Sequence, residues 1–248
     1  MTKEHSEVLP LELLFHIIDS IDSSSSEGRQ SLSACACVHH ALLIICQERL
    51  FRDIELSYFL NDDHKIVFCD GQGTTGHKFL GLLAASPHIG SHVRNLTINV
   101  VGGTALPKSF ELCSTSPSFS FYRIVPQLSN LQGLFAHNRN GFYRDVFDER
   151  TESFFINLAP SLTKLDLFLL PPLPLSIFSN CNRLEELHIN GLTMDVAHLP
   201  MNMNKVKLRV LEVSYGPTHD NKPMTPLFSA PSSPLDISHL RSLKLEGI

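Results

Sequence analysis

Three glycines near residue 70 have the spacing of a phosphate-binding loop. Residues 71–76, GQGTTG, match the pattern G-x-G-x-x-G, follow a β-prone run and precede a helix-like run. In a dinucleotide-binding unit such a loop cradles a pyrophosphate, and an acidic residue about 20 positions further on holds the ribose. The strand expected there, residues 95–101, contains no acidic residue. We therefore interpret the glycines as a flexible surface loop, and a nucleotide-dependent enzyme remains only a third alternative.

A second group of reactive residues, Cys35, Cys37, His39 and His40, has ligand types suited to zinc. On a helix Cys35 and Cys37 lie about 200° apart, so that only Cys35 and His39 share a face. A structural zinc site needs four ligands, and small buried thiols account better for this pattern. The serines, cysteines, histidines and acids of the chain form no grouping with a recognisable catalytic signature. We expect no catalytic residue, no metal and no cofactor, hence a protein that is not an enzyme.

Composition narrows the class of protein further. Of the 248 residues 43% are apolar and 18% charged, which describes a folded chain rather than a disordered one. The net charge of −5 disfavours a nucleic-acid partner, because binding phosphates needs a basic face. Six scattered cysteines and a polar first segment, MTKEHSE, indicate reduced thiols and no signal peptide. The longest apolar run has six residues against the roughly 20 that a bilayer requires. We expect an intracellular protein of the cytoplasm, the nucleus or both, without membrane contact.

The elements that hold these residues begin with an unusually apolar helix. Residues 8–21, VLPLELLFHIIDSI, place Pro10 in the first turn and Glu12 near the positive helix end. At about 100° per residue, apolar side chains occupy all but a narrow polar sector. They are Leu9, Leu11, Leu13, Leu14, Phe15, Ile17, Ile18 and Ile21. A unit of about fifty residues cannot enclose that much apolar surface, so the helix is expected to bind a partner.

The segment that follows shows what kind of partner to expect. Together with the first helix, Leu32, Cys35, Val38, Leu50-Phe51, Ile54 and Leu56 give residues 8–56 a strong resemblance to the F-box of the large families in mushroom-forming fungi. The resemblance implies a three-helix module that docks on the Skp-type adaptor of a cullin-based ubiquitin ligase. Two departures from the family are Leu42 where a Trp is frequent, and the serines at 23–26, which are expected to lengthen the first inter-helix loop. Residues 79–98, FLGLLAASPHIGSHVRNLTI, resemble the helix-then-strand passage that follows the F-box in these families.

The resemblance also implies which residues dock. The predicted adaptor-binding residues are Leu9, Pro10, Leu11, Leu14, Phe15 and Ile18. Within this helix we expect Leu11 and Phe15 on the exposed side and Leu13 in the internal core. The partners would be the adaptor, the cullin and a protein substrate whose identity the sequence does not give.

From residue 93 onward one phrase, L-x-x-L-x-L or a close variant, recurs six times. Its second leucine position falls at Leu96, Leu134, Leu165, Leu187, Leu211 and Leu243, at separations of 38, 31, 22, 24 and 32 residues. The phrase resembles the strand of a leucine-rich repeat, whose period is about 20–29 residues. Alternate residues of each strand would face inward and be buried only against neighbouring repeats. The alternative is an ordinary α/β domain with scattered leucines.

We therefore predict an α/β protein with two parts: an F-box at residues 1–56 and a short, irregular leucine-rich-repeat solenoid at 57–248. Strands are expected at 53–59 and 65–69, helices at 78–85, 121–128, 151–158 and 175–178, and long loops at 102–120 and 216–234. The predicted function is substrate recognition in an SCF-type ubiquitin ligase. A leucine-rich interaction module without a ligase role is the alternative.

Two further expectations concern the repeats. The residues between the inward leucine positions should face the concave side and bind the target, through basic and apolar features of that target. They are Phe135, His137, Asp166, Phe168, Glu186, His188, Asn190 and Glu212, in a column that also holds Asn95, Thr97, Asn99 and Lys164. The last phrase, residues 240–248, has no capping repeat after it, so this end is expected to be frayed or sticky, in a truncated product or in a chain that needs a partner there.

Overall fold

The computed structural model describes residues 10–60, 66–67, 75–102, 123–138, 155–168, 173–191, 194–195, 205–214 and 233–246. The chain divides into two compact units, Met1–Asp53 and Ile54–Ile248, which we call the helical unit and the strand unit. The division falls three residues before the boundary expected from the sequence, at the start of the first strand. Helices together with a mainly parallel sheet make this an α/β protein, as predicted.

The helical unit contains three helices, α1 (Leu11–Ser20), α2 (Ser26–Val38) and α3 (His40–Phe51). The Ser25 hydroxyl caps α2 by accepting a hydrogen bond of 3.0 Å from the Gly28 N–H, and the His39 ring caps α3 by accepting from the Ala41 N–H at 3.1 Å. The serines at 23–26 were expected to lengthen the loop before α2. Ser23 and Ser24 do lie in that loop, whereas Ser25 caps α2 and Ser26 begins it, because a serine hydroxyl satisfies an N–H that the first helical turn leaves free.

The core of the helical unit joins all three helices. Its fully buried members are Ile18, Leu32, Leu42 and Cys46, and Leu14, Phe15, Ile21, Cys35, Ala36, Ile45 and Leu50 pack around them. Gly28 allows the closest approach in this unit: a Cβ atom there would lie 1.8 Å from the carbonyl oxygen of Asp22. A side chain at position 28 would therefore push α2 away from the turn that precedes it.

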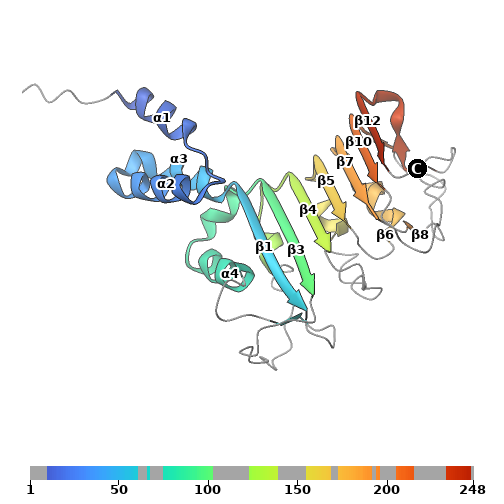
Figure 1. The fold of residues 1–248 in the computed structure, drawn as a ribbon, viewed down its shortest axis with the longest axis horizontal. Helices are drawn as coiled ribbons and strands as arrows, with labels where there is room; N and C mark the ends of the chain where they lie inside the picture. The colour runs from blue at the N-terminus through green and yellow to red at the C-terminus, as the bar shows by residue number, and fades with distance from the viewer. Residues whose placement is uncertain are drawn as a thin grey trace, which may run out of the picture. The chain divides into compact units, whose positions relative to one another are not determined.

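The strand unit is built on one sheet of eight strands that lie almost in sequence order. The order is β12-β10-β7-β5-β4-β3-β1-β2, and it can be followed by colour from cyan β1 to red β12 (Figure 1). Consecutive strands from β3 to β12 pair in parallel, whereas β2 pairs antiparallel with β1. The strands are β1 (Asp53–Leu60), β2 (Ile66–Val67), β3 (Asn95–Gly102), β4 (Gly133–Asn138), β5 (Lys164–Phe168), β7 (Glu186–Asn190), β10 (Val210–Ser214) and β12 (Ser242–Glu246).

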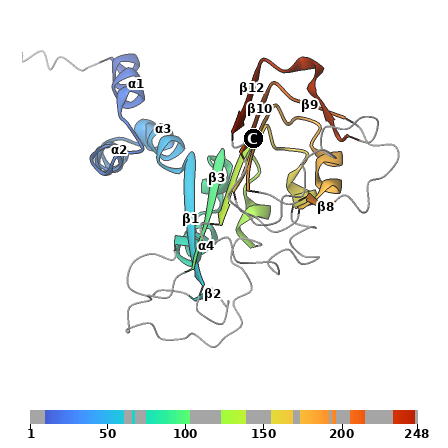
Figure 2. The same cartoon turned by 45° about the vertical axis from the view of Figure 1, so that its right-hand side comes forward.

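Short elements return the chain from one strand to the next. They are α4 (Thr75–Ala85), η1 (Pro87–Ser91), η2 (Val125–Gln127), η3 (Leu175–Asn180), η4 (Ile237–His239) and the paired two-residue strands β6 (Leu173–Pro174) with β8 (Met194–Asp195) and β9 (Val206–Lys207) with β11 (Leu235–Asp236). Figure 2 shows β8 and β9 set to one side of the main sheet. The helix expected at 78–85 is confirmed and begins three residues earlier.

The other expected helices are helical over nearly all of their described residues. Residues 123–124 and 155–158 are α-helical, and residues 125–127 and 175–180 form tighter 3-10 turns. Most of the two predicted long loops, 102–120 and 216–234, lies outside the described residues, as do residues 71–74 of the glycine loop. Thr75 and Gly76 begin α4 and Gly76 is buried, so the surface loop expected over residues 71–76 does not include its last glycine.

The six leucines of the recurring phrase occupy one register across the sheet. Leu96, Leu134, Leu165, Leu187, Leu211 and Leu243 are Cα partners from each strand to the next. The second inward row is Ile98, Ala136, Leu167, Ile189, Val213 and Leu245. Both rows are buried from β3 to β10. The strands predicted from the phrase, and their inward leucines, are therefore confirmed for these five strands.

The turns that enter the strands repeat as closely as the leucines do. The carbonyls of Arg94, Gln132, Thr163, Glu185 and Arg209 each accept two hydrogen bonds, of 2.8 to 3.1 Å, from two consecutive N–H groups of the following repeat. Each repeat thus fixes the start of the next through backbone groups alone, which explains why very different connection lengths leave the register unchanged.

Candidate functional site

Exposed apolar side chains gather at two places in the described part of the chain. Eight large apolar side chains are exposed there, and five of them belong to the helical unit: Leu13, Ile17, Val38, Leu43 and Ile44. The remaining three are Ile237, in η4, and Leu243 and Leu245, in the last strand of the sheet. Isolated exposed apolar residues need no explanation, but a concentration of them marks a surface that another molecule covers.

On the helical unit, α1 carries an exposed apolar stripe. Leu13 and Ile17 are 49% and 51% exposed, and exposed Pro10 lies three residues before Leu13. Residues spaced by three and four positions share one side of a helix, so the three side chains form a continuous row, which we call the α1 stripe. A second exposed group, Val38, Leu43 and Ile44, lies at the end of α2 and on α3.

The assignment of faces made from the sequence is wrong at two positions. Leu13 was expected in the core and is half exposed, whereas Phe15 was expected on the exposed side and packs against the core. The side of α1 that faces α2 and α3 is centred on Ile18, which is 2% exposed, and Phe15 lies next to that centre while Leu13 lies on the far flank. Because α1 is apolar on most sides, its sequence did not show which flank turns inward.

The predicted adaptor-binding residues are distributed accordingly. Pro10 is exposed, Leu14 and Phe15 are partly buried against the core, and Ile18 is part of the core. Leu9 and the side chain of Leu11 lie outside the described residues. Two exposed residues of α1 were not predicted as docking residues from the sequence. Ile17 was left out of that set, and Leu13 was expected in the core.

On the strand unit, the face of the sheet opposite the leucine rows is lined by polar and aromatic side chains. All eight predicted target-binding residues lie on this polar sheet face and are partly exposed: Phe135, His137, Asp166, Phe168, Glu186, His188, Asn190 and Glu212. Asn99, from the wider column, differs because it is only 5% exposed and its amide donates a hydrogen bond of 2.5 Å to Glu55.

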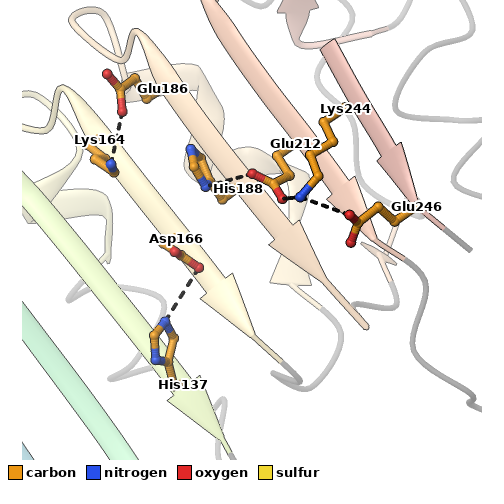
Figure 3. A network of polar contacts seen from close by, with 8 residues as sticks. All are labelled: His137, Lys164, Asp166, Glu186, His188, Glu212, Lys244 and Glu246. Carbon is orange, nitrogen blue, oxygen red and sulfur yellow. Dashed lines mark hydrogen bonds and ion pairs between the residues drawn. The ribbon is translucent and has the colours of Figure 1, made fainter. Parts of the chain in front are cut away.

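Ion pairs cross this face from strand to strand (Figure 3). Lys164 pairs with Glu186 at 3.0 Å, His137 with Asp166 at 3.5 Å, and His188 with Glu212 at 3.4 Å. Lys244 of β12 lies 2.7 Å from Glu212 and 2.8 Å from Glu246. Hydrogen bonds to these two carboxylates raise the pKa of Lys244, so this ammonium stays charged. Exposed and partly exposed pairs of this kind are weak because water screens them, so the network orders the side chains rather than stabilising the sheet.

Two aromatic rings accompany the charges. Lys164 Nζ lies 5.5 Å from the centre of the Phe135 ring, and the rings of His137 and Phe168 meet edge to face with centroids 6.0 Å apart. The face therefore offers carboxylates, imidazoles and aromatic surfaces side by side.

The sheet ends at β12, where the inward rows emerge from the core. Leu243 and Leu245, the last members of the two rows, are 56% and 46% exposed. Within the described residues β12 pairs on one side only, with β10. That this end is frayed or sticky stays a prediction.

The buried thiols expected at Cys35 and Cys37 are not found: Cys37 is exposed and Cys35 is only partly buried. Cys46 and Cys181 are buried, burial raises the pKa of both thiols, and the pKa of Cys181 rises to about 12. Among the described residues there is no group of three metal-ligating side chains. The helices of the described ranges are too short or too polar to cross a membrane. Comparison of the chain with protein-family models, curated proteins and solved structures finds no match.

Proposed function

We propose that the chain is a non-catalytic substrate-recognition subunit of an SCF-type ubiquitin ligase. In this proposal the helical unit is an F-box that docks on a Skp-type adaptor, and the strand unit is an irregular leucine-rich-repeat solenoid that holds a protein target. The repeated register of the six leucines and the repeated turns between strands support the solenoid assignment.

The α1 stripe is the observation that carries the proposal. The helical unit has a complete core built on Ile18, and yet Leu13 and Ile17 remain half exposed beside Pro10. An apolar row that the fold does not need for its own core is what a helix-binding groove requires. A partner that covers this row would bury two large aliphatic side chains, each worth about 1.5–3 kcal/mol when fully buried.

Adaptor capture by matched variants of α1 tests the proposal. Ile17→Asp places a charge in the apolar interface and should abolish co-purification of a Skp-type adaptor and its cullin. His16→Asp introduces the same charge one residue earlier, on the polar side of the same helix, and should leave capture unchanged. Circular dichroism should show both variants folded, because neither side chain belongs to the core.

Other results would contradict the proposal. Adaptor capture by Ile17→Asp at the wild-type level would remove the α1 stripe as the docking surface. A wild-type chain that captures no adaptor or cullin would favour an interaction module without a ligase role.

Target capture should depend on the other unit. Charge reversal at Glu186 and Glu212 should weaken target binding, because both carboxylates help to order the polar sheet face, and should leave adaptor binding intact. Proteins cross-linked in cells to the wild type and to the Glu186→Lys, Glu212→Lys variant can be compared by mass spectrometry. An unchanged set of cross-linked proteins would exclude this face as the target site.

A further inference from the structure

Asp166 lies at the centre of the polar sheet face. Its lateral neighbours are Phe135 on β4 and His188 on β7, and Lys164 and Phe168 stand two residues away on its own strand. Strands in a sheet are about 4.8 Å apart, and alternate residues of a strand share one face. Asp166 therefore shares its part of the face with two phenylalanines, a histidine and a lysine.

The charge around Asp166 is not balanced. From β4 to β12 the face carries four carboxylates, Asp166, Glu186, Glu212 and Glu246, and two ammonium groups, Lys164 and Lys244. Each glutamate of this set pairs with a lysine. Within the described ranges Asp166 pairs only with the His137 imidazole, at 3.5 Å, which is longer than the roughly 2.7–2.9 Å of a charged N–H···O contact.

Lys164 shows how this face holds a cation. Its ammonium lies between the Phe135 ring, 5.5 Å from the ring centre, and the Glu186 carboxylate, 3.0 Å away. A cation between an aromatic face and a carboxylate gains from both the ring quadrupole and the ion pair. Asp166 likewise combines a carboxylate with nearby aromatic residues, Phe135 and Phe168, but no lysine pairs with it among the described residues.

We propose that Asp166 binds the guanidinium group of an arginine in an extended segment of the partner protein. The guanidinium stacks beside Phe135 and Phe168 and displaces the weakly held His137 from Asp166. Arginine suits this place better than lysine because its planar group contacts a carboxylate through two parallel N–H donors and stacks on aromatic rings. The inference deepens the proposed function, since it names the chemistry of the target that the strand unit would hold.

Peptide titration of the purified full chain tests this site without any adaptor. The probes are two nine-residue glycine–serine peptides, one with a central arginine and one with citrulline, which keeps the shape and removes the charge. Binding is followed by NMR through the His137 ring signals. The arginine peptide should bind about tenfold more tightly than the citrulline peptide, as expected for a hydrogen-bonded charge pair.

Two conservative variants separate the central site from general attraction to an acidic surface. Asp166→Asn keeps the side-chain shape and should remove the preference for arginine. Glu246→Gln removes a carboxylate at the edge of the same face and should keep it. Equal affinities for the two peptides, or an arginine preference that survives Asp166→Asn, would overturn the proposal.

The same titration keeps the two proposals apart. Loss of adaptor capture in Ile17→Asp together with equal peptide affinities would leave the ligase proposal standing and reject the arginine site. A clear arginine preference in a chain that captures no adaptor would do the reverse.

Discussion

The leucine register makes a quantitative prediction about two equivalent residues. Leu187 of β7 and Leu243 of β12 hold the same position in their repeats, but Leu187 is fully buried and Leu243 is 56% exposed. Truncation of a buried leucine to alanine costs about 2–5 kcal/mol, because apolar contacts are lost and a cavity remains. Leu243 withdraws less than half of its surface from water, and water fills the space that truncation opens. Leu243→Ala should therefore cost about 1 kcal/mol or less.

Urea unfolding of the two variants provides the comparison. The chain has no tryptophan, so far-ultraviolet circular dichroism is the suitable signal. Low micromolar protein keeps molecules from covering β12 by association. Leu187→Ala should lower the free energy of unfolding by at least twice as much as Leu243→Ala.

Native-state hydrogen exchange gives a second measure on the unmodified chain. Amides of Leu243 to Leu245 should exchange far faster than those of Leu187 to Ile189, because an end strand opens without disturbing its neighbours. Equal costs of truncation, or equal protection in dilute monomer, would show that the inner side of β12 is covered in solution and would refute the reasoning.

Three smaller predictions concern single residues. Ser25→Ala should destabilise the helical unit by about 1 kcal/mol in thermal unfolding, since it removes the cap of α2, whereas Ser26→Ala, inside the same helix, should have little effect. Gly28→Ala should prevent folding of the helical unit, measured by its helical circular dichroism, because the new methyl group would overlap the Asp22 carbonyl. Alkylation at pH 8, followed by mass spectrometry, should modify exposed Cys37 and leave Cys181 intact. Burial raises the pKa of Cys181 to about 12, so at pH 8 this side chain stays in the unreactive thiol form.

The strands could be predicted from the sequence. Which polar side chains of neighbouring strands contact each other could not. A leucine three residues before an alternating run identifies a strand and its inward face, so Leu134, Leu165 and Leu187 were placed correctly without coordinates. The alternation also placed His137 and Asp166 on one face. Their pairing depends on the lateral register of β4 and β5, which connections of unequal length do not reveal.

The first helix shows the opposite case. Its existence and its excess of apolar residues followed from the sequence, but the inward flank did not. That choice is made by contacts of Ile18 with α2 and α3, between residues distant along the chain. Periodicity describes the faces of one helix and contains no information about which of two apolar flanks meets another helix.

The doubled hydrogen bonds at the repeat turns also bear on how this sheet comes apart under load. From Arg94 to Arg209, each such carbonyl binds the repeat that follows, and among the described residues no bond of this kind spans more than one junction. A pulling force applied at β12 therefore meets separate barriers one after another, lowest at half-exposed β12, and the strands should detach singly. The same independence lets a connection lengthen by many residues without disturbing the strands on either side.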